Sequence, residues 1–247
     1  MKMTIMIDKT VLLNQVKGTN MRLKSHYYLR LLSAAYFSLL LIGCADELTL
    51  CPDGNHPHAI DLGLPSGTLW SCCNLGAPSP GQTGGYYAWG ETDIKQVYDE
   101  QHYSSDFEHS YLGEYRKDLP EHIAGSLYDA ATQKWGSSWH IPTPDQIYEL
   151  LRYCKIEYNM EHEGTKGIVI VGPSGNSIFL PSTGTYYGAR LSKLGEGGTY
   201  WSDAQRIPQK VETGAINPYG LEFSTTGSAF QRGVYLWAGS SIRPVKE

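Results

Sequence analysis

The sequence predicts an α+β domain that follows an export signal. Short segments typical of strands occur before, between and after one or two helical segments, which indicates α+β rather than a parallel α/β sheet. The 247-residue chain is 41% hydrophobic and 12% aromatic, so it can bury a core and is not dominated by disorder. Its 27 glycines and 13 prolines exclude a coiled coil.

The charge of the chain is unevenly distributed. Six of the 20 basic residues but only one of the 25 acidic residues lie within 1–43. The remaining chain is therefore more acidic than the formal net charge of -5 indicates. An acidic surface repels a phosphate backbone, and the pI near 5.9 gives no basic footprint. We expect no nucleic-acid partner.

Residues 1–43 have the pattern of a bacterial export signal. Basic residues precede an apolar run at 31–42, which is shorter than the roughly 20 residues of a membrane-spanning helix. Residues 1–20 add nothing that such a signal requires, so we expect them to be a mis-called start. The signal peptide then occupies 21–43. The alternative is a buried core helix that ends in an incidental cysteine.

The residues after the apolar run predict a lipid anchor. The segment Leu41-Ile42-Gly43-Cys44 resembles a bacterial lipobox, whose cysteine is diacylated and becomes the first residue of the mature chain. The acidic residues Asp46 and Glu47 resemble the surface-export signal of Bacteroides-type lipoproteins. We therefore expect the lipid on Cys44 to hold the protein in the bacterial outer membrane, facing the cell exterior.

The first part of the mature chain reads as short strands and irregular segments. Residues 44–57 form a polar leader without periodicity, and two strands are expected at 58–64 and 68–75. The glycine-flanked aromatic run 84–90 predicts a strand edge that lies close to other backbone. Residues 91–123 are polar and rich in tyrosine, so we expect an irregular region there.

Two helices are expected, at 127–135 and 144–154. The second has the clearer signals, because Thr143, a proline at the first helical position and Gln146 form a capping box. Its apolar residues at 147, 150, 151 and 154 follow the spacing i, i+3, i+4 and i+7, which makes one stripe. This spacing predicts that Cys154 faces the core from the helix.

The last part of the chain reads as strands. A hairpin is predicted from 166–171 and 176–180, around a Gly-Pro-Ser-Gly turn. Further strands are expected at 199–203, 219–223, 233–237 and 241–245.

The cysteine count fits an exported protein. If Cys44 carries lipid, an even number remains, namely Cys51, Cys72, Cys73 and Cys154. Four cysteines allow three pairings, and the adjacent pair is the least favourable one. On a strand, Cys72 and Cys73 point to opposite faces, so they should have different partners. The alternative is a set of buried free thiols.

Several multi-residue motifs occur together in one known family. They are IDLGLPSGTLW (60–70), CCNLGA (72–77), GGYYAWGET (84–92), WGSSWHIPT (135–143), GPSGNSIFLP (172–181), TYWSD (199–203) and SIRPV (241–245). Over roughly 51–245 the chain resembles the Fibrobacter succinogenes major paralogous domain family, which is common in Bacteroides-type surface lipoproteins.

The resemblance implies a C-type-lectin-like fold over 58–247, with mixed or antiparallel sheets, one or two helices and long irregular loops. In that fold the terminal strands pair, which places 60–62 near 242–245. The resemblance also implies the disulfide pairings Cys73–Cys154 and Cys51–Cys72. The related formylglycine-generating enzymes hold copper with a thiolate pair near their C-terminal end. This chain has no cysteine after Cys154.

Other catalytic and metal-binding patterns are weak in this sequence. Residues 201–203 keep the Trp and Asp of a calcium-lectin strand but lack its amide ligand. No GxSxG elbow supports a serine hydrolase. His56, His58 and the triplet 161–163 are zinc-ligand types without helical i,i+4 spacing, so we expect solvated loop residues. We therefore expect no catalytic residue, metal or cofactor.

Aromatic and arginine side chains recur between 185 and 240, and such residues dominate recognition surfaces. Alternation along 233–237 places the rings of Tyr235 and Trp237 on the outer side of the predicted strand and Val234 and Leu236 inside. The predicted ligand-binding residues are Tyr200, Arg232, Tyr235 and Trp237. The alternative inverts this segment and buries the two rings.

These observations predict a non-enzymatic binding or adhesion module for a glycan or protein ligand. One alternative is a glycan-active enzyme that uses Asp203 and Glu222 as an acid/base pair. Glycosidases hold such carboxyls about 5–5.5 Å or 6.5–9.5 Å apart. The other alternative is a structural subunit of a surface assembly, which predicts a broad apolar patch.

Overall fold

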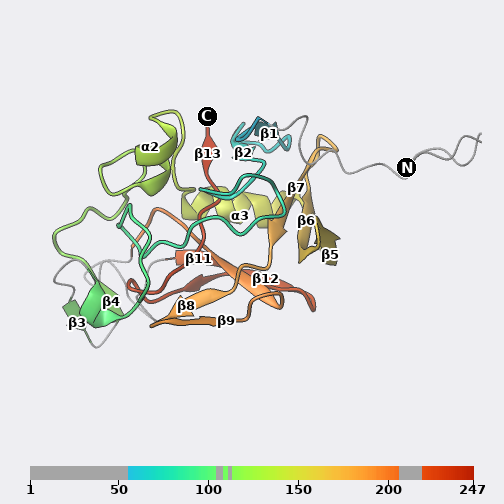
Figure 1. The fold of residues 1–247 in the computed structure, drawn as a ribbon. Helices are drawn as coiled ribbons and strands as arrows, with labels where there is room; N and C mark the ends of the chain where they lie inside the picture. The colour runs from blue at the N-terminus through green and yellow to red at the C-terminus, as the bar shows by residue number, and fades with distance from the viewer. Residues whose placement is uncertain (1–54, 104–107, 111–112, 206–218) are drawn as a thin grey trace, which may run out of the picture. The chain divides into compact units, whose positions relative to one another are not determined.

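The computed structural model describes residues 55–103, 108–110, 113–205 and 219–247, and the side chains of 104–115 are outside this description (Figure 1). The chain divides into two compact units, Met1–Glu47 and Leu48–Glu247. All described residues belong to the second unit. The expected signal peptide, Cys44 and Cys51 lie outside the described residues. Within the described part, no helix is long and apolar enough to cross a membrane.

The two ends of the described chain meet in one small antiparallel sheet. Strand β2 (Leu69–Ser71) lies between β1 (Ala59–Asp61) and β13 (Val245–Lys246). Trp70 faces Ile60 on one side and Val245 on the other. The segments 60–62 and 242–245, which were expected to lie close together, thus contribute strands to one sheet, with β2 between these strands. Both predicted N-terminal strands are shorter than expected.

A second antiparallel sheet contains the predicted hairpin. Strands β6 (Thr165–Val171) and β7 (Ser177–Pro181) pair as expected, and β5 (Lys155–His162) adds a third strand at the edge of β6. Strand β5 was not predicted from the sequence. None of its residues is fully buried, and its register shifts between Glu157 and Met160, so its apolar pattern is weak.

A third antiparallel sheet has the order β10 (Gly197–Trp201), β11 (Tyr219–Ser224) and β12 (Ser228–Gly233). The strand predicted at 233–237 is wrong. The chain leaves the sheet after Gly233 and turns, with the Ala238 N–H donating to the Tyr235 carbonyl at 2.9 Å. A further hairpin consists of β8 (Thr185–Tyr187) and β9 (Arg190–Ser192).

Both predicted helices are present, α2 (Ala130–Trp135) and α3 (Pro144–Tyr153). The capping box of α3 is confirmed, because Thr143 and Gln146 exchange side-chain-to-backbone hydrogen bonds of 2.9 and 3.1 Å. The region 91–123, expected to be irregular, also contains a short 3-10 turn, η1 (Glu100–His102), and a hairpin of β3 (Glu108–Ser110) and β4 (Gly113–Tyr115).

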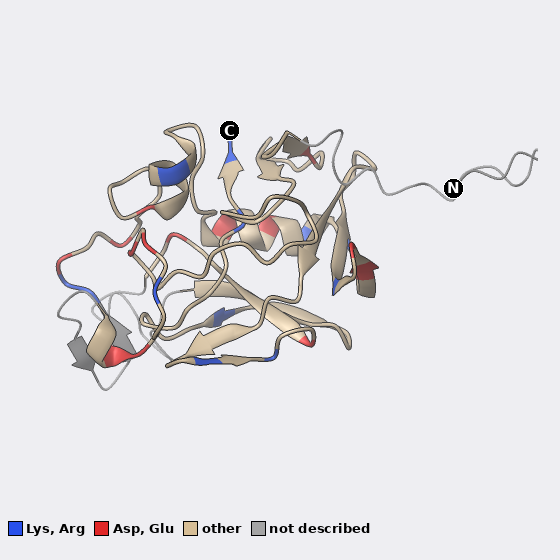
Figure 2. Ribbon diagram, viewed as in Figure 1, with Lys and Arg blue, Asp and Glu red and all other residues tan. Residues whose placement is uncertain are grey.

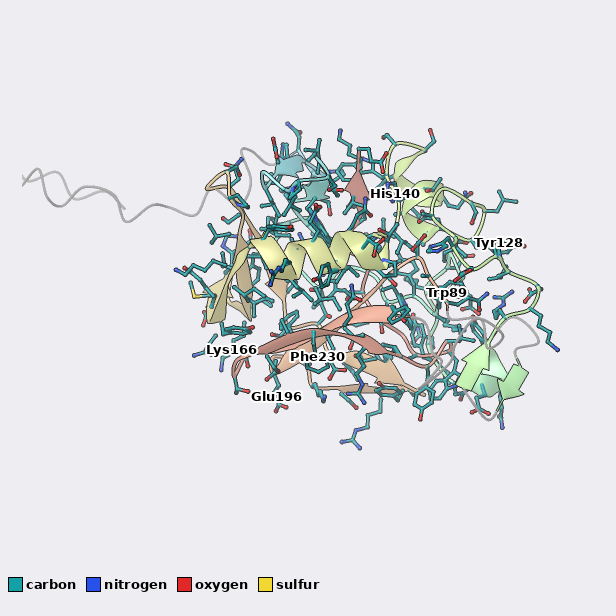
Figure 3. All side chains as sticks on the ribbon, turned by 180° about the vertical axis from the view of Figure 1, so that it is seen from behind. Trp89, Tyr128, His140, Lys166, Glu196 and Phe230 are labelled. Carbon is teal, nitrogen blue, oxygen red and sulfur yellow. The ribbon has the colours of Figure 1, made fainter. Side chains whose placement is uncertain are left out.

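The core consists of two main apolar clusters. Helix α3 lies between the β1-β2-β13 sheet and the β10-β11-β12 sheet, and side chains fill the space around it (Figures 1 and 3). Its buried residues Ile147 and Leu150 belong to the first cluster. The second cluster contains Trp89, labelled in Figure 3, together with Trp201 and Leu236. This described part is α+β, as expected.

One predicted disulfide is not formed. Cys154 is a free, half-buried thiol, and burial raises its pKa to about 11. Helix α3 ends at Tyr153, and Cys154 is its C-cap in an extended conformation at the entry to β5. The side chain therefore packs against the edge of the first cluster and makes no bond to Cys73. The Cys51–Cys72 pairing involves a residue outside the described part and stays a prediction.

Candidate functional site

A recess lies where the β8–β9 hairpin meets the β10-β11-β12 sheet. Its volume is about 180 Å³, and its lining includes Thr185, Tyr187, Lys193, Thr199, Glu222 and Arg232. Its aromatic and charged residues come from four different strands or turns, namely Tyr187, Lys193, Glu222 and Arg232. Two residues of this lining were predicted from the sequence, Arg232 as a ligand-binding residue and Glu222 as a carboxylate of the enzyme alternative.

Glycines allow the hairpin to lie against the sheet. Gly184 forms a parallel bridge with Gly198, and the Gly184 N–H donates to the Gly197 carbonyl at 2.8 Å. Gly184 has φ +68°, and a Cβ there would lie 2.3 Å from the Ser192 carbonyl oxygen. A side chain at this position would therefore clash with the backbone at the end of β9 and distort the hairpin.

The polar groups of the recess are arranged around Glu222. Its carboxylate oxygens lie 3.1 Å from Lys193 Nζ and 3.1 Å from Arg232 Nη1. Glu222 faces Thr199 across the β10–β11 ladder, and the hydroxyls of Thr199 and Thr185 are 2.8 Å apart. Ion pairs of partly exposed groups contribute little to stability, so these polar groups can exchange partners with a ligand at small cost.

An aromatic cluster lies beside the recess and consists of Tyr187, Tyr235 and Trp237. The Tyr235 and Trp237 rings are stacked, with centroids 4.9 Å apart and planes at 7°. The Tyr187 ring meets Trp237 edge-on at 5.9 Å. Tyr187 is 41% exposed and Tyr235 46% exposed. Burial raises the pKa of Tyr187, and the nearby Glu222 adds to this shift.

The alternation predicted for this segment holds although it is not a strand. Val234 and Leu236 are buried, Tyr235 is exposed and Trp237 is half-buried against the second core cluster. The inverted arrangement, with both rings beneath Val234 and Leu236, is therefore wrong. The role of Tyr235 and Trp237 in ligand binding stays a prediction.

Tyr200 is a correction to the predicted binding surface, because its side chain is buried. Its hydroxyl donates to the Pro181 carbonyl at 2.7 Å and lies 3.3 Å from Asn74 Nδ2. Burial raises the pKa of Tyr200 to about 12. All five residues of β10 are buried, because the strand is covered on both faces. Tyr200 therefore belongs to the core, as Trp201 does.

The structure separates the two carboxylates of the enzyme alternative. Glu222 faces Thr199 and lines the recess, whereas Asp203 lies beyond the end of β10 and is not part of the recess lining. Asp203 is buried, and His122 Nδ1 lies 3.1 Å from its carboxylate. Burial raises the pKa of Asp203, and His122 opposes that shift. Among the residues that line the recess, Glu222 is the single carboxylate.

Charged residues are not concentrated in one element of the described chain. Figure 2 shows Lys and Arg interspersed with Asp and Glu along helices and strands alike. The recess is thus distinguished by the grouping of aromatic and paired charged side chains rather than by a field of one sign.

No protein family, curated protein or solved structure matches this chain. Its function has to be inferred from the recess and from the sequence signals.

Proposed function

We propose that this protein is a non-enzymatic binding module with a C-type-lectin-like fold, which holds a glycan at the recess beside β8 and β9. The observation that carries the proposal is the position of the aromatic cluster next to Glu222 and its two cationic partners. Ligand sites commonly combine apolar and aromatic walls with a few convergent polar groups.

The residue types of the recess match the two kinds of surface that a sugar presents. The C–H groups on one face of a sugar ring can pack against the exposed rings of Tyr187 and Tyr235. Its hydroxyls can donate to Glu222 and accept from Lys193 and Arg232, whose charged nitrogens each lie 3.1 Å from a Glu222 carboxylate oxygen. Charge-assisted hydrogen bonds of this kind give both affinity and orientation.

The same observations favour binding over hydrolysis of the ligand. Glycosidases act with two carboxyls, and the recess has one, which is held between two cations. A structural subunit would instead be expected to use a broad apolar patch. The large exposed hydrophobic residues of the described part are distributed among different elements, for example Ile94, Tyr148 and Phe230.

Glycan binding is tested with the full-chain protein on a glycan array, followed by calorimetric titration of the strongest ligand. We expect Tyr187→Ala and Glu222→Gln each to weaken binding about tenfold or more, which is about 1.4 kcal/mol. Tyr148→Ala is the matched control, because Tyr148 is 62% exposed on α3 and does not line the recess.

Three results would contradict the glycan proposal. If the protein bound another protein and no glycan, the ligand would be a protein and not a glycan. Equal losses for Tyr187→Ala and Tyr148→Ala would place the binding surface elsewhere. Turnover of a glycan by the wild-type protein would restore the enzyme alternative.

We also propose that lipid on Cys44 anchors the protein in the outer membrane with the binding module outside the cell. Support comes from the basic residues, the short apolar run and the lipobox-like segment ending at Cys44. Cys44→Ala is expected to abolish palmitate labelling and to move the protein from the membrane pellet to the soluble fraction. Cys154→Ala is the control and should leave labelling unchanged. Labelling that persists without Cys44 would refute the lipid anchor.

A further inference from the structure

Two histidines and two adjacent cysteines meet beside the β1–β2 pair. His56 Nδ1 lies 3.2 Å from Cys72 Sγ, and His58 Nδ1 lies 3.7 Å from the same sulfur. The ligand atoms of His56, Cys72 and Cys73 all lie within 4.8 Å of one another. Both cysteines are fully buried, and both histidines are half-buried. The expectation that His56 and His58 are solvated loop residues is therefore wrong.

The local fold explains how adjacent cysteines reach one group. Strand β2 ends at Ser71, and the chain bends at Cys72 and Cys73. The strict alternation of a strand no longer applies at a bend, so the two sulfurs need not point to opposite faces. The Cys72 N–H donates to the His58 carbonyl at 3.0 Å, which continues the β1–β2 ladder by one step and holds His58 opposite Cys72.

The geometry points to a zinc-binding site formed by His56, Cys72 and Cys73, with His58 as the nearest donor for the fourth position. In a tetrahedral zinc site, Zn–S bonds near 2.3 Å and Zn–N bonds near 2.0–2.1 Å place neighbouring ligand atoms about 3.5–3.8 Å apart. The distances from Cys72 Sγ to His56 Nδ1 and to His58 Nδ1 are 3.2 and 3.7 Å, close to that range. The ligand atoms of His56, Cys72 and Cys73 are at most 4.8 Å apart, so a small shift would bring them to the zinc distances. Thiolate and imidazole donors are those that favour zinc over magnesium or calcium.

A buried cation is held against the residue that precedes the two cysteines. Arg243 is 1% exposed, and its guanidinium donates to the neutral carbonyls of Ser71, at 3.1 Å, and Phe179. A fixed positive charge next to a thiol stabilises the thiolate, which is the form that binds metal.

Metal binding here is a ligand exchange without redox chemistry. Zn²⁺ loses one bound water for each ligand and the two thiols release their protons to solvent, so that two Zn–S bonds and the Zn–N bonds to His56 and His58 form. The site and the Cys51–Cys72 disulfide exclude each other, because both need the Sγ of Cys72. The proposal thus assigns Cys72 to the metal in the native protein.

The test uses the full-chain protein, isolated without reductant for thiol and disulfide mapping and then reduced and freed of metal for titration. We expect one Zn²⁺ per chain, bound at submicromolar concentration in competition with a chromophoric chelator. Co²⁺ in place of zinc should give the visible bands of a tetrahedral site and a near-ultraviolet sulfur-to-cobalt charge-transfer band. Cys73→Ser and His56→Ala should each weaken Zn²⁺ binding at least tenfold.

Matched variants separate this site from nonspecific binding. Cys154→Ser and His162→Ala change a cysteine and a histidine outside the cluster and should leave the zinc affinity unchanged. His56 is half-buried and not part of the core, so His56→Ala decides the question if a cysteine variant fails to fold. No stoichiometric zinc in the reduced chain, zinc affinity unaffected by His56→Ala, or Cys72 found in a disulfide in the isolated protein would each overturn the proposal.

Discussion

Replacing Asp129 with alanine is expected to lower the free energy of unfolding by roughly 3–5 kcal/mol, because a buried carboxylate with many donors is lost. Asp129 is fully buried just before α2. Its two oxygens accept from the backbone N–H groups of Gly125, Ala131, Thr132 and Ile141, at 2.9 to 3.2 Å, and from the Thr132 hydroxyl at 2.9 Å. Alanine leaves these donors without an acceptor in a dry environment.

Urea unfolding followed by circular dichroism measures this loss. Asp145→Ala is the control, because Asp145 likewise lies at the start of a helix, in the first turn of α3, but is exposed to solvent. We expect that control to cost at most about 1 kcal/mol. A similar small cost for Asp129→Ala would mean that water or a shifted backbone replaces the carboxylate.

The second large effect is expected for Trp201→Ala, which should cost roughly 3–5 kcal/mol. The Trp201 ring is 1% exposed, and its Nε1–H donates to the Tyr87 carbonyl at 2.7 Å. Trp89 makes the reciprocal contact, because its Nε1–H donates to the Ser202 carbonyl at 3.1 Å. The two indoles thus attach the segment 84–90 to the end of β10, and truncation removes both packing and one of these hydrogen bonds.

Trp237→Ala is the matched comparison and should cost about 1–2 kcal/mol, since the ring is half-buried. Its Nε1 makes no hydrogen bond within the described part, so no polar partner is orphaned by the change. Thermal and urea unfolding of both variants give the comparison. If Trp237→Ala destabilised the protein as much as Trp201→Ala, Trp237 would be a core residue and its place in the aromatic cluster would be structural.

Local signals in the sequence were sufficient for several elements. The capping box at Thr143 and the stripe through Ile147 and Leu150 predict α3, because both depend on residues within one or two turns. The hairpin of β6 and β7 follows from two strongly apolar runs around a tight turn. The buried positions of Val234 and Leu236 agree with the predicted alternation, although the chain turns at 235–238 instead of forming a strand.

Other elements depended on partners that are distant in sequence. Strand β12 (228–233) has little apolar alternation, and it is a strand because β11 offers it a complete ladder from Tyr219 to Ser224. The segment 233–237 has the better strand pattern but turns away to bury Leu236. The free thiol of Cys154 has a similar cause, because the start of β5 sets the direction in which the chain leaves α3.

By itself, the sequence determined the α+β class, both helices, the main hairpin, and the segments from which the candidate site is built. Tertiary structure alone decided which side chains face one another. Tyr200 is buried because β10 is covered on both faces, and Glu222 meets Lys193 because β9 leads into a turn beside β11. His56 reaches Cys72 because β1 and β2 pair in one register. Propensity and periodicity act over a few neighbouring residues, whereas these contacts depend on burial and pairing between strands that are far apart in the chain.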